Sequence, residues 1–387
     1  MSSDYIKAKQ AREIARFNRR ETAKLEKKLE QYSDSERICE MKNPSSIVEF
    51  DDMHTYFYSE SGVVKAVDGI TFEIPKGKTV GVVGESGCGK SVTSLSLMRL
   101  LPRPEGQIVS GSVRLNTGKE VIDIAKTPPE KMGGIRGAVV SMIFQEPMTS
   151  LNPVLRIGKQ LDEVIELHMD DLIERGVMKS HDKAAIKQRS VEMLDTVAIT
   201  NPEGVYKMYP HELSGGMRQR VMIAMALACN PALIIADEPT TALDVTIQAQ
   251  ILDLLRELKN RINSSIMLIT HDLGVVAEMA DYVIVMYSGK IVERGTAREI
   301  YAAPSHPYTI GLMKSKPVPG QHVKRLYSIP GKVPNPINMP SYCYYKDRCE
   351  FACDKCEEYP KETMLSDTHI VSCWRCLENL GGEISEE

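Results

Sequence analysis

One glycine-rich segment constrains the fold of this chain more than any other feature of the sequence. It matches the pattern G-x-x-x-x-G-K-S/T, between an apolar run at residues 79–83 and a helical pattern at residues 92–101. Its eight residues are Gly84, Glu85, Ser86, Gly87, Cys88, Gly89, Lys90 and Ser91. Buried strand, loop and helix in this order are the context in which the pattern forms a phosphate-binding loop. We therefore expect an α/β core with this loop at the end of a parallel strand.

Each residue type in the phosphate loop has a physical role. Small residues let backbone N–H groups between Gly84 and Val92 turn toward phosphate oxygens, and the following helix adds its positive N-terminal end. Lys90 places a positive charge on the β and γ phosphates, and the Ser91 hydroxyl completes the coordination of Mg²⁺. The loop therefore predicts a site for a nucleoside triphosphate.

A second part of this site lies far along the chain. The apolar run Leu233–Ala236 is typical of a buried strand, and it ends in two adjacent carboxylates, Asp237 and Glu238. At the carboxyl end of a core strand, Asp237 can reach the Mg²⁺ shell, and Glu238 can act as general base on the attacking water. The pair predicts that the bound triphosphate is hydrolysed.

Composition and charge exclude several classes of protein. With 387 residues, 42% hydrophobic and 26% charged, the chain can bury a full core. Its apolar runs fall far short of the ~20 residues that cross a bilayer, and its start is too charged for a signal peptide. A formal net charge of −4 and a pI near 6.1 provide no electrostatic attraction to nucleic acid, which we do not expect as a partner.

Changes in composition and in the pattern of apolar residues divide the chain into three parts. Residues 1–45 are rich in Lys, Arg and Glu and predict a charged helical extension, either solvated or in contact with lipid or a partner. Residues 46–300 begin with an antiparallel layer, alternate strands and helices, and contain a helical insertion at about residues 147–230. Residues 301–387 are rich in Pro and Cys, which predicts a linker and a small separate module.

The segment Leu213–Arg220, LSGGMRQR, resembles the LSGGQ signature of the ATP-binding cassette (ABC) ATPases. Other landmarks of that family follow in order: Gln145 before the helical insertion, residues 241–244 after the two carboxylates, and His271 after the next predicted strand. The resemblance covers residues 47 to about 300. It implies a P-loop NTPase core of the ABC type, with an antiparallel β layer, a helical subdomain, and ATP as the nucleotide.

The resemblance also implies roles for single residues. Gln145 is expected to sense the γ phosphate or its Mg²⁺, His271 to help hold the attacking water, and Tyr58 to stack on adenine. In this family the signature of one subunit closes over the ATP that the other subunit holds. The residues expected to act in this way on a partner's site are Ser214, Gly215, Gly216 and Asp244. A lone copy of the chain should therefore hydrolyse ATP poorly.

Several stretches are similar to the ATP-binding subunits of oligopeptide and dipeptide importers, a group that includes nickel importers. They are Val63–Gly69, Gln145–Pro153, His306–Thr309 and Ile329–Asn335. This resemblance implies a related ATPase subunit as partner in a heterodimer, two membrane permease subunits, an extracellular solute-binding protein, and a place at the cytoplasmic face of the membrane. An importer of another small solute, such as nickel or a sugar, and a non-transport ABC ATPase are the alternatives.

Six of the nine cysteines lie in the last fifth of the chain and are compatible with two kinds of metal site. Two C-x-x-C pairs, at residues 353–356 and 373–376, have the spacing of a four-thiolate zinc site. The family resemblance instead implies a 4Fe–4S cluster. Its expected ligands are Cys343, Cys349, Cys356 and Cys373. We expect iron–sulfur, with zinc or uncoordinated thiols as alternatives, and Cys353 and Cys376 as extra thiols that leave the ligand choice open.

Overall fold

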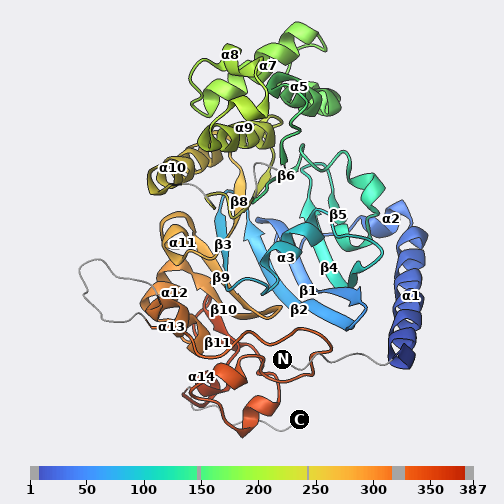
Figure 1. Ribbon diagram of the computed structural model, residues 1–387, viewed down its shortest axis with the longest axis vertical. Coiled ribbons are helices and arrows are strands. Elements are labelled where there is room, and N and C mark those ends of the chain that lie inside the picture. The colour runs from blue at the N-terminus through green and yellow to red at the C-terminus, as the bar shows by residue number, and fades with distance from the viewer. Residues whose placement is uncertain (1–7, 146–149, 242–243, 316–326, 380–387) are drawn as a thin grey trace.

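The computed structural model describes residues 8–145, 150–241, 244–315 and 327–379. Figure 1 shows a tier of helices at the top, two sheets in the middle, and the C-terminal segment, residues 327–379, at the bottom. A long helix, α1 (Ala8–Gln31), stands at one side of the sheets. Among the helices of the described residues, none is long and apolar enough to cross a membrane.

A mixed sheet forms the centre of the molecule. Its strands are β3 (Thr79–Val83), β6 (Val140–Ile143), β7 (Leu233–Asp237), β8 (Ser265–Thr270), β9 (Tyr282–Tyr287), β10 (Lys290–Thr296), β11 (Thr363–Met364) and β12 (Ile370–Val371). They lie in the order β11-β12-β10-β9-β3-β8-β7-β6, and the strands from β9 to β6 are parallel. Strands β3, β7 and β8 are buried along their whole length, which is why their sequences are continuous apolar runs.

An antiparallel sheet covers one side of this core, as the sequence predicts. Its strands are β1 (Ser46–Ser59), β2 (Gly62–Pro75), β4 (Gly106–Asn116) and β5 (Val121–Asp123), in the order β2-β1-β4-β5. Phe50 of β1 lies opposite Phe72 of β2, and their rings stack with centroids 4.4 Å apart. Apolar residues of both sheets and of α3 (Lys90–Leu97) form one core cluster, which holds the phosphate loop between the two sheets.

The tier of helices confirms the predicted helical insertion. It contains α5 (Ile157–Leu167), α6 (Met169–Glu174), α7 (Lys183–Thr196), α8 (Pro202–Tyr206) and α9 (Gly215–Leu227). The periodic residues Ile157, Leu161 and Ile165 of α5 are fully buried in a second core cluster, as their spacing near 3.6 residues predicts. The same cluster includes residues of α10 (Val245–Ile262), so the tier packs directly on the core domain.

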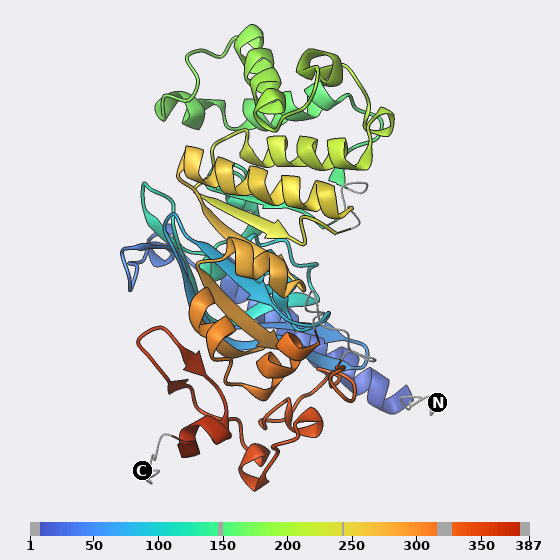
Figure 2. The same cartoon turned by 90° about the vertical axis from the view of Figure 1, so that its left-hand side faces the viewer.

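The C-terminal segment is attached to the core sheet rather than separate from it. Its strand β12 pairs with β10, and β11 extends the sheet by one more strand. Glu293 of β10, which is fully buried, pairs with His369 at 2.8 Å and accepts the N–H groups of Ser305 and His306. Figure 2 shows the segment below the core. In the chain it follows the helices α11 (Leu273–Met279), α12 (Ala297–Ala302) and α13 (Pro307–Lys314), and it ends in α14 (Trp374–Asn379). Long-range strand pairing of this kind has no signal in a Pro- and Cys-rich sequence.

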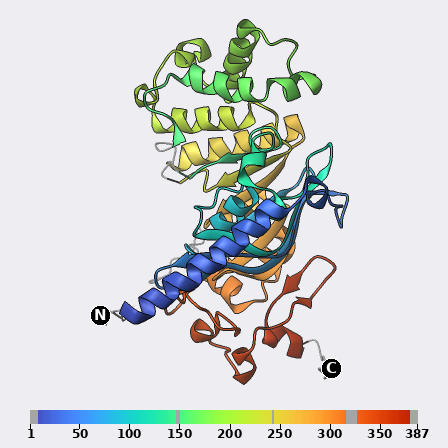
Figure 3. The same ribbon diagram turned by 90° about the vertical axis from the view of Figure 1, so that its right-hand side faces the viewer.

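The amino-terminal helix lies along the antiparallel sheet, as Figure 3 shows. The Asn18 amide donates to the carbonyl of Ser59 at 2.8 Å, and Glu26 pairs with Arg103 at 3.2 Å. Leu29 is only 6% exposed. The helix is therefore docked through a narrow set of contacts, while most of its charged residues remain in solvent. The short helix α2 (Asp34–Arg37) follows it in the chain.

Candidate functional site

The phosphate loop passes so close to other backbone segments that two of its glycines cannot be replaced without rearrangement. A Cβ atom at Gly89, where φ is +100°, would lie 2.4 Å from the carbonyl oxygen of Ala66. A Cβ atom at Gly84 would lie 2.3 Å from the carbonyl oxygen of Met286. Both are shorter than any normal contact, so the glycines of the motif are needed for the path of the loop as well as for phosphate access.

Lys90 directs its ammonium group back into the loop. The residue is 5% exposed, and its Nζ donates to the carbonyl oxygens of Gly84 at 2.7 Å and of Glu85 at 3.0 Å. These two bonds keep the charge inside the curve of the loop. The position agrees with the role predicted for Lys90 on the β and γ phosphates.

Ser91 and Asp237 form a pair of oxygen donors beside Lys90. Burial raises the pKa of Asp237, while a hydrogen bond from Ser91 and the charge of Lys90 act in the opposite direction. The Oδ1 atom of Asp237 is buried and has no hydrogen-bond partner in the described residues. A buried carboxylate oxygen without a partner is costly, and a hard cation such as Mg²⁺ would satisfy it. The donors present therefore fit the predicted magnesium site.

Three side chains meet at Glu238. The amide of Gln145 donates to Glu238 Oε2 at 3.2 Å, and the Thr241 hydroxyl donates to the same oxygen at 2.9 Å. His271 Nδ1 lies 3.3 Å from Glu238 Oε1. Glu238 itself has φ +47°, a left-handed conformation that is strained for a residue with a side chain. The carboxylate is thus held in one orientation, as a general base requires.

These groups meet because the strands before them are neighbours. The phosphate loop follows β3, His271 follows β8, Glu238 follows β7 and Gln145 follows β6 shortly after its end. In the sheet these strands lie in the order β3-β8-β7-β6, all parallel. Carboxyl ends of adjacent parallel strands meet at one edge, which is where ligands bind in such sheets. The structure therefore brings Lys90, Ser91 and Asp237 together with the predicted catalytic groups at this edge of the sheet.

The residues expected to act on a partner's nucleotide lie at helix N-termini. Ser214 Oγ accepts the N–H of Met217 at 3.3 Å at the start of α9, which Gly215 and Gly216 begin. Asp244 Oδ1 accepts the N–H of Ile247 at 3.0 Å at the start of α10. Each side chain caps a helix in the usual way. Their role in a partner's site stays a prediction.

The aromatic residues near the end of β1 differ in their contacts. The Tyr56 hydroxyl donates to Asp68 at 2.6 Å, so this ring belongs to the antiparallel sheet. Tyr58 is half-buried near the hairpin tip, where burial and the neighbouring Glu21 of α1 raise its pKa. Its role as the adenine platform stays a prediction.

An apolar groove lies between the core sheet and the tier of helices. Its volume is about 480 Å³, and Phe144, 40% exposed, forms part of its wall. Other lining residues are Met142, Leu151, Val164, Met222 and Met225. Part of the stretch quoted for the peptide-importer resemblance, residues 146–149, lies outside the described residues.

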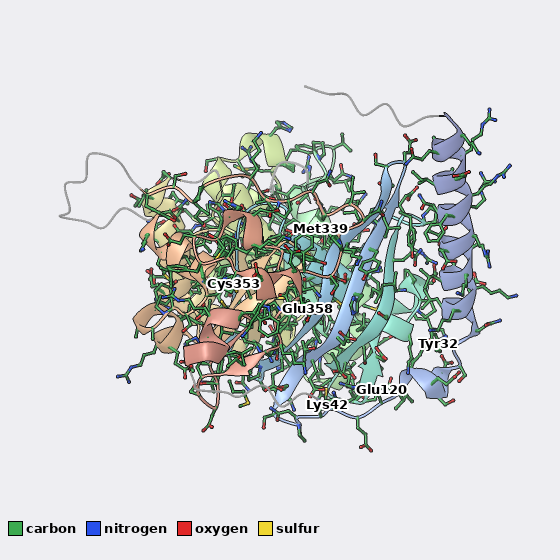
Figure 4. All side chains as sticks on the ribbon, turned by 90° about the horizontal axis from the view of Figure 1, so that it is seen from below. Tyr32, Lys42, Glu120, Met339, Cys353 and Glu358 are labelled. Atoms are coloured by element: carbon green, nitrogen blue, oxygen red, sulfur yellow. The ribbon has the colours of Figure 1, made fainter. Side chains whose placement is uncertain are left out.

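Five cysteines line one cavity of about 290 Å³ in the C-terminal segment. They are Cys343, Cys349, Cys353, Cys356 and Cys373. Figure 4 shows Cys353 on the opposite side of the antiparallel sheet from Tyr32 and α1. Cys376 does not line the cavity, and its sulfur lies 3.7 Å from the carbonyl oxygen of Ser305. Within the described residues, no group of three or more His, Cys, Asp or Glu side chains is arranged to hold a metal ion.

Some functional contacts have no counterpart in the sequence analysis. Thr241, which donates a hydrogen bond to Glu238, belongs to the family landmark at residues 241–244, but nothing in that landmark indicates this contact. Tyr308 and Arg348 contact the phosphate loop from more than 200 residues away along the chain. In the sequence, Tyr308 lies in the His-Pro-Tyr-Thr stretch and Arg348 lies directly before a cysteine. Neither feature indicates a contact with the phosphate loop.

Two family patterns match the chain. The pattern described as "ABC transporter" matches residues 67–241, which include the phosphate loop and both carboxylates. The pattern described as "Oligopeptide/dipeptide transporter, C-terminal region" matches residues 292–356, which include four of the five cysteines around the cavity. The two matches follow one another along the chain in the same order as the nucleotide site and the cysteine cavity.

Known proteins that resemble this chain in sequence or fold include ATP-binding proteins of peptide transport. The oligopeptide transport ATP-binding protein AppD of Bacillus subtilis is 51% identical over 312 residues, which are 81% of this chain and 91% of that protein. The oligopeptide transport ATP-binding protein OppD of Salmonella typhimurium is 44% identical over 347 residues, 89% of this chain and 99% of that protein. The dimeric ATP-binding cassette MJ0796, solved with ADP and Pi, shares the fold, with a TM-score of 0.56, 24% identity, and coverage of 65% of this chain and 99% of that one. This chain therefore belongs to the ABC ATPases, in the family of oligopeptide and dipeptide transport ATP-binding proteins.

Proposed function

We propose that this ABC ATPase energises the import of oligopeptides or dipeptides across the cytoplasmic membrane. The observation that carries the proposal is Glu238, held by Gln145, Thr241 and His271 beside the magnesium donors, in a chain whose C-terminal region matches that of peptide transporters. AppD and OppD, the two relatives named above, are oligopeptide transport ATP-binding proteins. Import of nickel or a sugar and a non-transport role have no comparable support.

The arrangement of side chains supports hydrolysis by direct attack of water. The loop amides and Lys90 hold the β and γ phosphates, and Ser91 and Asp237 would hold Mg²⁺, which neutralises charge on the phosphate oxygens. Glu238 accepts the proton from the attacking water while the bond between the γ phosphorus and the leaving ADP oxygen breaks. His271 and Gln145 orient the carboxylate. The products are ADP, phosphate and the proton on Glu238, which then returns to solvent.

In this proposal a second, related ATPase subunit completes the site. Ser214, Gly215, Gly216 and Asp244 lie at helix N-termini, where free N–H groups favour an anion. The partner's equivalent segment would close on the γ phosphate held by this chain. Closure and reopening of the pair would then switch the membrane subunits between inward and outward openings.

The apolar groove supports the proposed docking of two membrane permease subunits. An exposed Phe144 and a wall that contains Met222 and Met225 are unusual for a surface that faces water. The groove joins the sheet edge near Gln145 to helix α9, so a permease segment seated there would sense both. This docking would place the chain at the cytoplasmic face of the membrane, with an extracellular binding protein delivering the peptide.

For the cysteine cavity we propose a 4Fe–4S cluster. A void of about 290 Å³ among five thiols is larger than a single ion needs, and four-thiolate ligation is usual for such clusters. The zinc alternative requires Cys376, which does not line the cavity, although its thiol shares a hydrogen bond with that of Cys373, which does. Bound there, the cluster would supply iron–thiolate bonds that cross-link the loops around it. Anaerobic purification with iron, sulfide and zinc assays tests this: about four irons with absorption near ~400 nm support it, and stoichiometric zinc contradicts it.

Reconstitution tests the transport function. The chain would be co-expressed with its partner ATPase and candidate permeases, placed in proteoliposomes, and supplied with a binding protein loaded with peptide, nickel or sugar. We expect ATP-dependent uptake of labelled peptide only, and no uptake when Glu238→Gln replaces the native chain. Uptake of nickel or sugar without peptide would refute the substrate class, and ATP turnover with no dependence on permeases would refute transport.

A further inference from the structure

Arg348 joins the cysteine cavity to the phosphate loop. It ends the short 3₁₀ turn η4 (Lys346–Arg348), directly before Cys349 of the cavity. Its Nη1 and Nη2 atoms donate to the Glu85 carboxylate at 2.6 and 3.1 Å, and its side chain is only 4% exposed. Its Nε donates to the carbonyl of Pro330 at 2.8 Å. A bidentate pair of this kind, in which the arginine is nearly buried and the carboxylate is partly exposed, fixes both partners in position as well as balancing their charges.

A second contact reaches the same loop residue. The backbone N–H of Glu85 donates to the Tyr308 hydroxyl at 2.8 Å. The fully buried Tyr308 ring packs against Tyr345, with centroids 5.5 Å apart, and Tyr345 lines the cysteine cavity. Both the carboxylate and the amide of Glu85 are therefore held by residues directly next to the cavity lining, since Arg348 precedes Cys349 and Tyr308 packs on Tyr345.

Glu85 in turn contributes to the position of Lys90, whose Nζ donates to the Glu85 carbonyl. A shift of Glu85 would therefore move an acceptor of the charge that binds the β and γ phosphates. The Glu85 carboxylate also adds negative charge next to a site for a polyanion. Arg348 neutralises that charge, and its loss would leave an unpaired carboxylate on the phosphate loop.

We propose that Arg348 is a positioning residue for the phosphate loop, and that through Glu85 it couples the cysteine cavity to nucleotide affinity. This inference rests on the proposed function only in taking the phosphate loop as the ATP site. A change in what the thiols bind moves η4 and thereby weakens or strengthens ATP binding. Because coupling between two binding sites is reciprocal, bound ATP must also change the affinity of the thiols for what they bind. We expect the shift of η4 that causes this to change the rate at which the thiols are alkylated as well.

The first test measures the affinity of a fluorescent ATP analogue for the purified full-length chain in its reduced, metal-free form. Arg348→Gln should weaken binding by about 5- to 150-fold, the range of typical coupling energies, and Arg348→Lys should restore part of it. The same Arg348→Gln change should have little further effect in a Glu85→Gln background, because the carboxylate to be neutralised is gone. Lys332→Gln, an exposed change in the same segment, is the matched control.

The second test follows the alkylation of Cys349 and Cys353 by iodoacetamide, with mass spectrometry, with and without ATP. In the native chain ATP should change the alkylation rate, and Glu85→Gln should abolish that change. This variant leaves Arg348 in place, so it tests the contact even if Arg348→Gln does not fold. Circular dichroism checks the fold of each variant.

The proposal is overturned if Arg348→Gln binds ATP as Lys332→Gln does, if the two changes at Glu85 and Arg348 are additive, or if ATP leaves the alkylation rates unchanged. These measurements need no permease, peptide or metal cluster. Failure of peptide uptake would therefore leave the coupling intact, and failure of the coupling would leave peptide transport intact.

Discussion

The nucleotide site and the cysteine cavity are built on different kinds of backbone. Groups of the nucleotide site follow four adjacent parallel strands, whose ladder hydrogen bonds hold their ends in register. The cavity is lined instead by loops, including the residues on either side of η4, by the 3₁₀ turn η5 (Asp354–Glu357), and by the start of α14. Strand ends are positioned without a ligand, whereas loops around thiols depend more on what the thiols bind. We therefore expect mutations in the nucleotide site to change ATP turnover or affinity, and mutations in the cysteine cavity to change metal content.

The largest expected effect sharpens this contrast at the nucleotide site. Glu238→Gln removes the proposed general base and should lower the turnover of the assembled ATPase by roughly 10²- to 10⁴-fold, while ATP binding is retained. The metal content of the cysteine cavity should not change. Phosphate release from the reconstituted complex measures turnover, and the exposed Glu257→Gln on α10 is the control. Unaltered turnover in Glu238→Gln would remove this carboxylate from its role.

Lys90→Ala tests binding rather than chemistry at the same site. Loss of the charged hydrogen bonds to the phosphates, worth about 1.5–3 kcal/mol, should weaken ATP binding by roughly 10- to 150-fold. Equilibrium titration with a fluorescent ATP analogue measures the affinity. Lys183→Ala, at an exposed position in the tier of helices, should bind as the native chain does. Equal affinities for the two variants would contradict the assignment of Lys90.

A comparison of two cysteines tests the other region. Cys349 lines the cavity and Cys376 does not, so Cys349→Ser should lower bound iron by about 10-fold or more, while Cys376→Ser should keep most of it. Iron and sulfide assays on anaerobically purified protein measure the difference. If Cys376→Ser loses metal and Cys349→Ser retains it, the ligand set is the one that the paired C-x-x-C spacing predicts.

The smallest expected effect lies at Asp68, where the C-terminal segment contacts the antiparallel sheet. This carboxylate accepts hydrogen bonds from Tyr344 of the C-terminal segment and from Tyr56, and it lies 3.1 Å from His54. The hydrogen bond to Asp68, with help from the Asp52 charge, raises the pKa of His54 above 6.5. Protonated His54 therefore stabilises the folded chain fully below about pH 6.5, and this contribution is lost as the pH rises through the folded-state pKa.

His54→Gln should accordingly lower the free energy of unfolding by less than about 1 kcal/mol at pH 6 and by nothing resolvable at pH 9. Urea unfolding at the two pH values measures the difference, with the exposed His211→Gln as control. A loss that is larger at pH 9 than at pH 6 would contradict the sign of this linkage.

The sequence predicted the nucleotide site in detail because most of its chemistry is local. The phosphate loop works through its own backbone, and its strand and helix lie on either side of it in the chain. Gln145, Glu238 and His271 could be named because each follows a recognisable strand or motif. The cysteines could be identified as a group, but their spacing allowed two ligand sets, since it says nothing about which thiols face one cavity.

What the sequence alone determined is the order along the chain of the strands, the loops and the residues of the candidate nucleotide site, since these follow from local patterns of polarity, glycine and charge. Only the tertiary structure decided that α1 docks on the antiparallel sheet, that β11 and β12 extend the core sheet, and that Arg348 binds Glu85. Each of these depends on contacts between residues far apart in the chain. Such contacts are selected by packing and pairing in the folded molecule, and no local pattern specifies them.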